Sequence, residues 1–229
     1  MQRVDLHVHT RYSPDSGTSP ARLVERCLRV GLSCIAVTDH NTIRGALEVA
    51  RLAPFPVIVG EEVKTADGDL IGLFLREEVP RGLPAAETAR RIHDVGGLVS
   101  VPHPFDTVRR SVLTPDGLEA VLPHADMVEG FNARNTFASA NRRAREAAAR
   151  FGAPTVAVSD AHHPLELGRT YTELPDFDGT ADGLKRALAD ARLVGRPASP
   201  LVHLVSTYHK IAGRVGCLSH RGGGAAGEG

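Results

Sequence analysis

The sequence predicts an α/β fold of the barrel type. Short β-rich runs alternate with helical stretches, several helical stretches end in glycine, and residues that can bind metal stand where the expected strands end. Such alternation is typical of βα units around a parallel sheet or barrel. At 229 residues with 42% hydrophobic residues, the chain can bury one sizeable core.

Six apolar runs bounded by turn residues are expected as core strands. They cover Arg3–Val8, Ser33–Thr38, Pro56–Val63, Gly97–Val101, Ala125–Phe131 and Pro154–Ser159. A further strand, Asp69–Leu75, is expected to form a hairpin with Glu62–Thr65 through Ala66–Gly68.

The segments between these strands carry helical patterns. They are Ser19–Val30, Thr42–Leu52, Leu83–Val95, Pro115–Leu122 and Phe137–Phe151, followed by Ala181–Ala191 and an amphipathic Leu201–Val215. Ser19 is expected as an N-cap with Pro20 in the first turn. Gly31, Gly96 and Gly152 suit helix ends. We expect one domain over residues 1–215, including the C-terminal helix, and a disordered tail over 216–229, which reads RGGGAAGEG at its end.

The charge balance excludes some partners. Lys and Arg total 27 and Asp and Glu total 27, so the chain lacks the net charge that favours duplex DNA or a membrane surface. Phosphorylated small molecules stay compatible, because a metal site and a few arginines bind phosphate without a basic surface. Cys27, Cys34 and Cys217 show no paired or metal-type spacing and are expected as free thiols. The N-terminus lacks a signal-peptide pattern and no apolar run reaches membrane-spanning length, so a cytoplasmic protein is expected.

Polar and metal-binding residue types follow every expected core strand. They are His7 and His9, Asp39 and His40, Glu61 and Glu62, His103, Asn132, and Asp160 with His162. In parallel α/β folds the carboxyl ends of the strands meet at one edge, where ligands gather. Scattered surface histidines would not line up in this way. The alignment predicts a metal site at that edge.

The H-x-H spacing gives this prediction a geometry. Residues two apart on a strand face the same side, so His7 and His9 can point at one ion. By the same parity, Asp5 is expected one layer deeper, hydrogen-bonded to an imidazole. Asp39 would point the other way from His40, so we expect it to have a structural role or to support a ligand. The same parity applies to Glu61 against Glu62, unless a bulge there reverses it. An isolated H-x-H fits two ordinary histidines on a half-buried strand equally well, but the later motifs argue against that interpretation.

Taken in order, DLHVHTRYSPD, AVTDHNT, GEEV, VPHP and SDAH resemble the motifs of the PHP (polymerase and histidinol phosphatase) family, in its small stand-alone phosphoesterase branch. The resemblance covers roughly residues 1–170. It implies a distorted seven-stranded (β/α) barrel with two or three divalent ions, usually manganese, zinc or iron, at the carboxyl ends of the strands. It implies that one metal is held by His7, His9, Glu62 and Asp160. It implies that another is held by Asp15, His40 and His162.

The resemblance also implies a third ion, bridged by Glu62 and held by His103. Relatives often supply a further histidine from the next strand, whereas here the stretch GDLIGL offers Asp69. A carboxylate can ligate manganese or iron, so Asp69 is a candidate ligand of a harder site. Such a site is either retained or partly empty.

Mixed imidazole and carboxylate ligands suit zinc, manganese or iron better than calcium. Clustered divalent ions activate water, and we hypothesise a metal-bridging hydroxide, held by Glu62 and Asp160, as the nucleophile for phosphoester hydrolysis. No G-x-S-x-G motif or Gly-rich triphosphate loop competes. Candidates to bind the substrate phosphate are Arg109, Arg110, Arg134 and Asn132, although loop arginines are often merely solvated and Asn132 suits a strand-end turn equally well.

Three functions are compatible with these residues. The first is a phosphomonoesterase or short-nucleotide hydrolase acting on nucleoside bisphosphates or 5′-phosphorylated oligoribonucleotides. The second is a histidinol-phosphate-type phosphatase acting on a small metabolite. The third is a metal-stabilised module without catalysis, which the nearly complete ligand set disfavours. Relatives of the first type often carry an inserted domain between the middle strands, and this chain runs directly from VPHPFD to the next helix.

Overall fold

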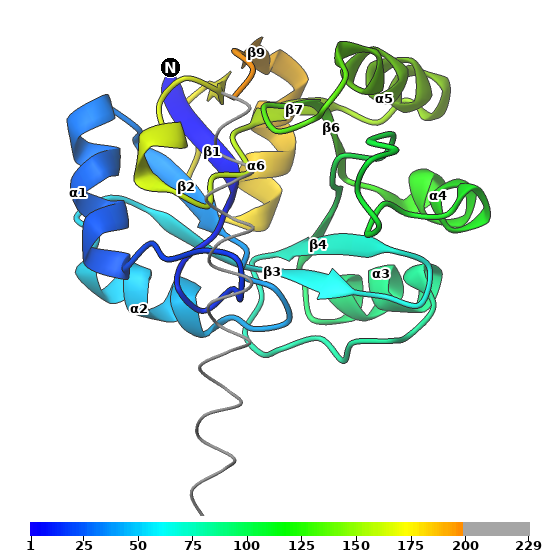
Figure 1. The fold of residues 1–229 in the computed structure, drawn as a ribbon, viewed down its shortest axis with the longest axis horizontal. Helices are drawn as coiled ribbons and strands as arrows, with labels where there is room; N and C mark the ends of the chain where they lie inside the picture. Colours follow the sequence, from blue (N-terminus) through cyan, green and yellow to red (C-terminus); the bar gives the residue numbers. More distant parts are fainter. Residues whose placement is uncertain (199–229) are drawn as a thin grey trace, which may run out of the picture.

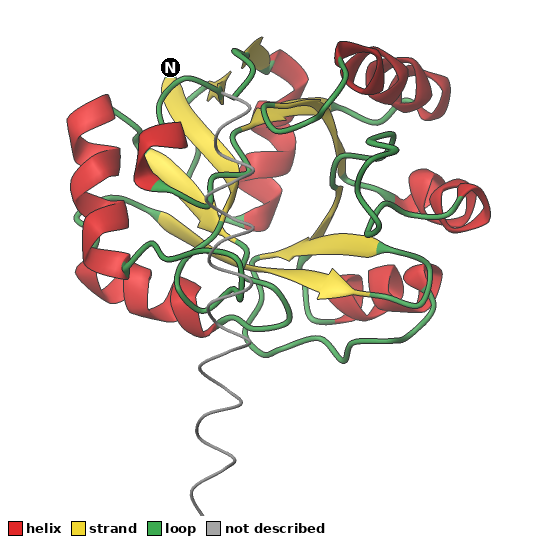
Figure 2. Cartoon of the chain, in the orientation of Figure 1, coloured by secondary structure: helices red, strands yellow, loops and turns green. Residues whose placement is uncertain are grey.

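The computed structural model describes residues 1–198, which form one curved sheet with helices around it (Figures 1 and 2). The strands are β1 (Gln2–Val8), β2 (Cys34–Val37), β3 (Val57–Lys64), β4 (Asp69–Leu73), β5 (Leu98–Val101), β6 (Met127–Asn132), β7 (Thr155–Val158), β8 (Tyr171–Leu174) and β9 (Arg192–Val194). Their order in the sheet is β7-β6-β5-β4-β3-β2-β1-β8-β9.

The sheet is nearly closed into a barrel, because β7 curves back towards β1 and β8. A parallel bridge joins Val8 to Ala161, and the Ala157 amide donates to the Thr172 hydroxyl at 2.9 Å. The predicted barrel-type α/β fold is confirmed. The expected count of seven strands is corrected to nine in the described residues, because β8 and β9 add antiparallel strands at the free edge of β1.

Strand direction decides which residues reach the site. The β1–β2–β3 and β5–β6–β7 groups are parallel, whereas β4 runs antiparallel to both β3 and β5. The predicted β3–β4 hairpin is confirmed, and its turn is closed by the Thr65 amide donating to the Gly68 carbonyl at 2.9 Å. The amino end of β4 therefore lies at the edge where β3 ends.

The helices follow the predicted spans closely. They are α1 (Pro20–Val30), α2 (Arg44–Leu52), α3 (Ala85–Asp94), α4 (Pro115–Val121), α5 (Ala138–Phe151) and α6 (Ala181–Ala187). Ser19 caps α1 by accepting from the Arg22 amide, and Gly31 and Gly152 end their helices in the left-handed conformation, as predicted. The helix expected over Ala181–Ala191 divides into α6 and a 3₁₀ turn, Leu188–Asp190. The expected helix Leu201–Val215 and the expected tail lie outside the described residues.

Apolar residues pack on both faces of the sheet. Inside it, strand residues such as Val4, Leu6 and Met127 pack with Leu184 of α6. Outside it, α1 and α2 cover β1 and β2, whereas α3, α4 and α5 cover the other half (Figure 1). Among residues 1–198, no helix is long and apolar enough to cross a membrane.

A β-bulge in β1 aims its histidines inward. The pairing of β1 with β2 shifts register between Asp5 and Val8. Val4 and Leu6 belong to the inner core, whereas Val8 packs with α1 and α2 outside the sheet. The bulge reverses the alternation, so His7 points inward while Asp5 does not.

Candidate metal centre

His7 and His9 meet at the centre of the strand-end cluster. Both are fully buried, and their Nε2 atoms lie 2.9 Å apart. His7 Nδ1 lies 2.6 Å from Glu129 Oε1, and His9 Nδ1 lies 3.0 Å from the Ser13 hydroxyl. These acceptors favour protons on both Nδ1 atoms, so both Nε2 lone pairs face the same space. That space requires a positive charge, either a proton or a metal ion.

Glu62, at the end of β3, joins four imidazoles. Its Oε2 lies 3.3 Å from Nε2 of both His7 and His9, and 3.1 Å from His40 Nδ1. Its Oε1 lies 3.2 Å from His103 Nε2. A single carboxylate in contact with four histidines from three strand ends is well placed to hold cations.

Asp160 provides the clearest test of whether metal ions fit. Its Oδ1 is buried and makes no hydrogen bond within the described residues. It lies 3.6 Å from His7 Nε2, 3.5 Å from His9 Nε2 and 3.5 Å from His162 Nδ1. A buried, unsatisfied carboxylate oxygen surrounded by imidazole nitrogens suits a divalent cation. The donor set therefore fits the metal ions that the sequence implies.

A second group lies on the open side of this cluster. Asp15 reaches His40 Nε2 at 3.5 Å through Oδ2 and His162 Nε2 at 3.4 Å through Oδ1. His9 connects this group to the first: its ring stacks on that of His40 with centroids 4.6 Å apart, and it lies tilted to that of His162 with centroids 4.2 Å apart. Three sets of ligand atoms lie mutually within 4.8 Å: His9, His40 and His162; His7, His9 and Glu62; and His40, Glu62 and Asp69. These sets share His9, His40 and Glu62 and so form one continuous cluster, in which Asp69 groups with His40 and Glu62 rather than with His103.

The charge of the cluster favours cations. Burial raises the pKa of Glu62, but the charges of His40 and His7 outweigh burial and hold that pKa well below its usual range. Burial likewise disfavours the charged form of His7, yet Asp160, Glu129 and Glu62 raise its pKa well above the ordinary value. For His162, burial and then the charges of His9 and Arg134 lower the pKa to about 3, which leaves its imidazole neutral. Ionised carboxylates and a neutral imidazole are the forms that bind metal.

Two strand-end residues adopt left-handed backbone conformations. His103 has φ 30° and Asp160 has φ 53°, values that non-glycine residues seldom adopt. Both side chains point into the cluster. Backbone strain at such positions is maintained by the surrounding structure and is common at functional sites.

The three arginines predicted to bind phosphate lie beside the cluster and differ in their burial and in their ion pairs. Arg109 Nη2 lies 2.6 Å from Asp160 Oδ2, and its Nε lies 3.2 Å from Asp106. Arg110 is exposed, whereas Arg134 is buried, with Nε 3.7 Å from Glu166. All three arginines line one cavity with Asp15, His40, Glu62, Asp69 and His162.

Asn132 is held by protein groups. Its amide nitrogen donates to Glu129 Oε2 at 2.8 Å and to Asp160 Oδ2 at 3.1 Å. Its Oδ1 accepts from the Arg134 amide at 2.9 Å. These contacts give Asn132, which ends β6, a role in orienting Asp160, which follows β7.

Sequence reasoning misassigned the partner of His7. The prediction that Asp5 hydrogen-bonds an imidazole is wrong, because the bulge turns Asp5 away and its Oδ1 accepts from the Ser159 amide. Glu129, which had not been predicted, holds His7 instead. Its only signal was a carboxylate inside the apolar strand MVEGFN, since a buried unpaired charge is costly.

Ser13 was also missed. Its hydroxyl donates to Asp39 Oδ1 at 2.7 Å and lies 3.0 Å from His9 Nδ1. Asp39 thus supports His9 indirectly, as the parity argument predicted for a residue facing away from the cluster. Glu61 also faces away, and it accepts from the Val79 amide at 2.9 Å.

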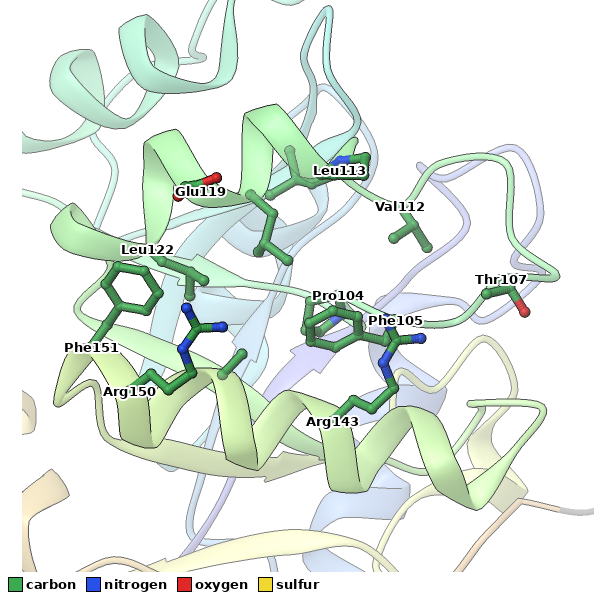
Figure 3. A pocket seen from close by; sticks show the side chains of 13 residues that line it. Pro104, Phe105, Thr107, Val112, Leu113, Glu119, Leu122, Arg143, Arg150 and Phe151 are labelled. Atoms are coloured by element: carbon green, nitrogen blue, oxygen red, sulfur yellow. The ribbon is translucent and has the colours of Figure 1, made fainter.

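Two cavities flank the loop that follows β5. The cavity beside the histidines has a volume of about 700 Å³. The other, of about 370 Å³, lies between α4 and α5 and is lined by apolar residues such as Phe105, Leu113 and Leu122 and by Arg143 and Arg150 of α5 (Figure 3). The smaller cavity contains none of the candidate metal ligands, so chemistry identifies the larger one as the functional pocket.

These observations define the class: an α/β protein with a nearly closed barrel-shaped sheet and a buried histidine–carboxylate cluster at the strand ends. The family model for the PHP domain matches residues 5–113, and the model described as PHP-associated matches residues 138–193. The chain belongs to the PHP domain family.

Two relatives come from the archaeon Methanocaldococcus jannaschii. The uncharacterized protein MJ1587 is 37% identical over 136 residues, which cover 51% of this chain and 80% of MJ1587. The uncharacterized protein MJ0417 is 34% identical over 180 residues, which cover 77% of this chain and 72% of MJ0417.

Solved structures share the fold at low sequence identity. A two-domain protein of Bacteroides vulgatus, described as containing a predicted PHP-like metal-dependent phosphoesterase, has a TM-score of 0.68 and 18% identity. The similarity covers 83% of this chain but 64% of that longer protein. An amidohydrolase of Chromobacterium violaceum, solved with bound sulfate and no metal, has a TM-score of 0.59 and 16% identity, covering 86% of this chain and 98% of that one. The chain therefore has the fold of PHP-like metal-dependent phosphoesterases.

Proposed function

We propose that the chain is a metal-dependent phosphoester hydrolase, a phosphomonoesterase or short-nucleotide hydrolase. The observation that carries the proposal is the meeting of His7, His9, Glu62 and Asp160 around one buried space, with Asp15, His40 and His162 adjoining it. This donor set suits manganese, zinc or iron. Such ions, when bound, activate water and stabilise negative charge on a phosphoryl group.

The protein groups supply positioning. Glu129 and Ser13 fix the two β1 imidazoles so that their Nε2 atoms face the cluster. Asn132 and Arg109 hold Oδ2 of Asp160, which leaves Oδ1 directed at the imidazoles. Ligands held in advance lose little entropy on binding metal, and they keep the reacting groups in register.

Cationic side chains make the 700 Å³ cavity suitable for an anion. Arg110 is exposed at its rim, and Arg109 and Arg134 lie deeper. A guanidinium binds phosphate through two parallel hydrogen bonds. We assign Arg110 and Arg109 to substrate phosphate binding and Arg134 to the support of that wall. The substrate is a small phosphorylated molecule, with nucleoside bisphosphates and 5′-phosphorylated short oligoribonucleotides as the first candidates.

The test is phosphate release in the presence of manganese from a panel of substrates. The panel contains nucleoside 3′,5′-bisphosphates, mononucleotides, 5′-phosphorylated oligoribonucleotides and histidinol phosphate. We expect turnover of one or more nucleotides, its loss in His9→Ala, and full activity in His93→Ala, whose imidazole pairs with Asp126 away from the site. Turnover of histidinol phosphate alone would favour a small-metabolite phosphatase. Bound metal without any turnover would favour a non-catalytic module, and full activity in His9→Ala would refute the assigned centre.

A further inference from the structure

The β3–β4 hairpin places a lysine at the edge of the metal cluster. Lys64 ends β3, Asp69 begins β4, and the two residues are paired in the antiparallel register. Lys64 Nζ lies 3.3 Å from Asp69 Oδ1. The carboxylate is 5% exposed and the lysine side chain 48% exposed, and both line the 700 Å³ cavity.

Asp69 faces a position that attracts positive charge. One of its oxygens lies within 4.8 Å of ligand atoms of His40 and Glu62. Burial and the neighbouring Glu62 raise the pKa of Asp69, whereas the charges of His103 and Lys64 act in the opposite direction. Two carboxylates this close need a cation between or beside them.

With Lys64 in place, the residues present fit a third metal ion poorly, although His40, Glu62 and Asp69 lie close enough to form a ligand group. The resemblance led us to expect such an ion between Glu62 and His103, with Asp69 replacing the histidine of relatives. His103 Nε2 contacts Glu62 Oε1, but His103 shares no ligand group with Asp69 in the described residues. The Lys64 ammonium already pairs with Asp69 at 3.3 Å, so a dication at this carboxylate would have to displace it or bear its repulsion.

We propose that the Lys64 ammonium supplies the positive charge of the third position, so that this chain holds two metal ions rather than three. The proposal rests on the metal centre assigned under the proposed function. A tethered ammonium is present at high effective concentration and has no coordination geometry to satisfy. The pocket thereby keeps a cation at this wall, facing the space into which a phosphate would bind.

The test is the number of manganese ions per chain, measured by elemental analysis after equilibration of the purified full-length protein with excess Mn²⁺ and removal of free ion. We expect two in the wild type, three in Lys64→Met, and two in the double variant Lys64→Met/Asp69→Asn. Lys185→Met is the matched control. Lys185 also pairs with a buried aspartate, Asp126, at 2.6 Å, but neither residue lines the 700 Å³ cavity. The control variant should retain two ions.

A count of three in the wild type, or of two in a folded Lys64→Met protein, would overturn the proposal. Circular dichroism of each variant establishes folding, and Lys64→Gln provides a second neutral side chain. The outcome is independent of turnover. Two ions without hydrolysis of any phosphoester would refute the proposed function and leave this inference standing, whereas three ions with hydrolysis would do the reverse.

Discussion

Glu129 Oε1 lies 2.6 Å from His7 Nδ1, although 122 residues separate them in the sequence. Its second oxygen accepts from the His103 amide at 2.8 Å and from Asn132 Nδ2 at 2.8 Å. One carboxylate on β6 thus orients candidate ligands from β1 and from the loop after β5.

Glu129→Gln should weaken metal binding about 10- to 100-fold, the usual effect of losing a partner that orients a ligand. The neutral amide keeps the shape of the side chain but removes the charge that favours the Nδ1 proton of His7. Manganese affinity by competition with a chelator measures this effect. Glu119→Gln, an exposed carboxylate on α4, is the control. Unchanged affinity in Glu129→Gln would mean that His7 needs no such partner.

Ser13→Ala should lower metal affinity several-fold and destabilise the fold by about 1–2 kcal/mol. The hydroxyl lies between His9 Nδ1, Asp39 Oδ1 and the His40 amide, so its loss leaves buried donors unsatisfied. Calorimetric titration with Mn²⁺ and urea unfolding separate the two effects. Ser33→Ala, which removes an exposed hydrogen bond to Arg3, is the control and should change the metal affinity and the free energy of unfolding much less.

Arg110→Ala should raise KM about tenfold, equivalent to about 1.4 kcal/mol, with an unchanged metal count. Arg110 is exposed at the rim of the pocket, so removing it costs a substrate contact and little else. Arg109→Ala should also reduce metal retention, because Arg109 contacts Asp160 at 2.6 Å. Steady-state kinetics on the best panel substrate would measure KM for both variants, with Arg90→Ala at an exposed position as the control, and the metal count would measure retention. An unchanged KM in Arg110→Ala would exclude a phosphate contact there.

Asp126 should contribute stability that disappears in acid. Burial raises its pKa, but hydrogen bonds from Lys185, the Val99 amide and His93 outweigh burial and lower the pKa below its ordinary value. The contribution is therefore complete above the unfolded-state pKa of about 3.9 and is lost as pH falls below it through the folded-state pKa. Asp126→Asn should cost about 1–2 kcal/mol at neutral pH and less at pH 3. Urea unfolding across this range tests the prediction, and a pH-independent difference would contradict it.

Cys27 and Cys34 should resist alkylation in the folded protein. Both are buried, and burial raises the pKa of each thiol to about 12. The reactive thiolate is therefore scarce at neutral pH. Mass spectrometry after iodoacetamide treatment should find both unmodified in the native protein and modified in urea. Rapid native labelling of Cys27 would show that the packing of α1 opens, and rapid labelling of Cys34 would show that the sheet opens at β2.

The sequence predicted the core strands and most of the residues that the structure brings together at the candidate site, because both depend on local patterns. Each apolar run matched a strand to within about two residues, and the strand-end rule placed His7, Glu62 and Asp160 at one edge. Strands β8 and β9 were missed, since they have four and three residues and pair far along the chain, as Gln2 does with Leu174. The β1 bulge and the role of Glu129 depend on register with neighbouring strands, which periodicity alone does not specify.

The direction of β4 has a consequence for folding kinetics. Lys64 and Asp69 are five positions apart on one hairpin, so their contact closes a short loop and can form early in folding. The contacts of His7 with Glu62 and Glu129 span 55 and 122 residues and require most of the sheet to be assembled. The Lys64–Asp69 pair should therefore form before the two metal-binding groups are assembled. We expect manganese to slow unfolding of the assembled sheet while leaving the formation of this hairpin unchanged.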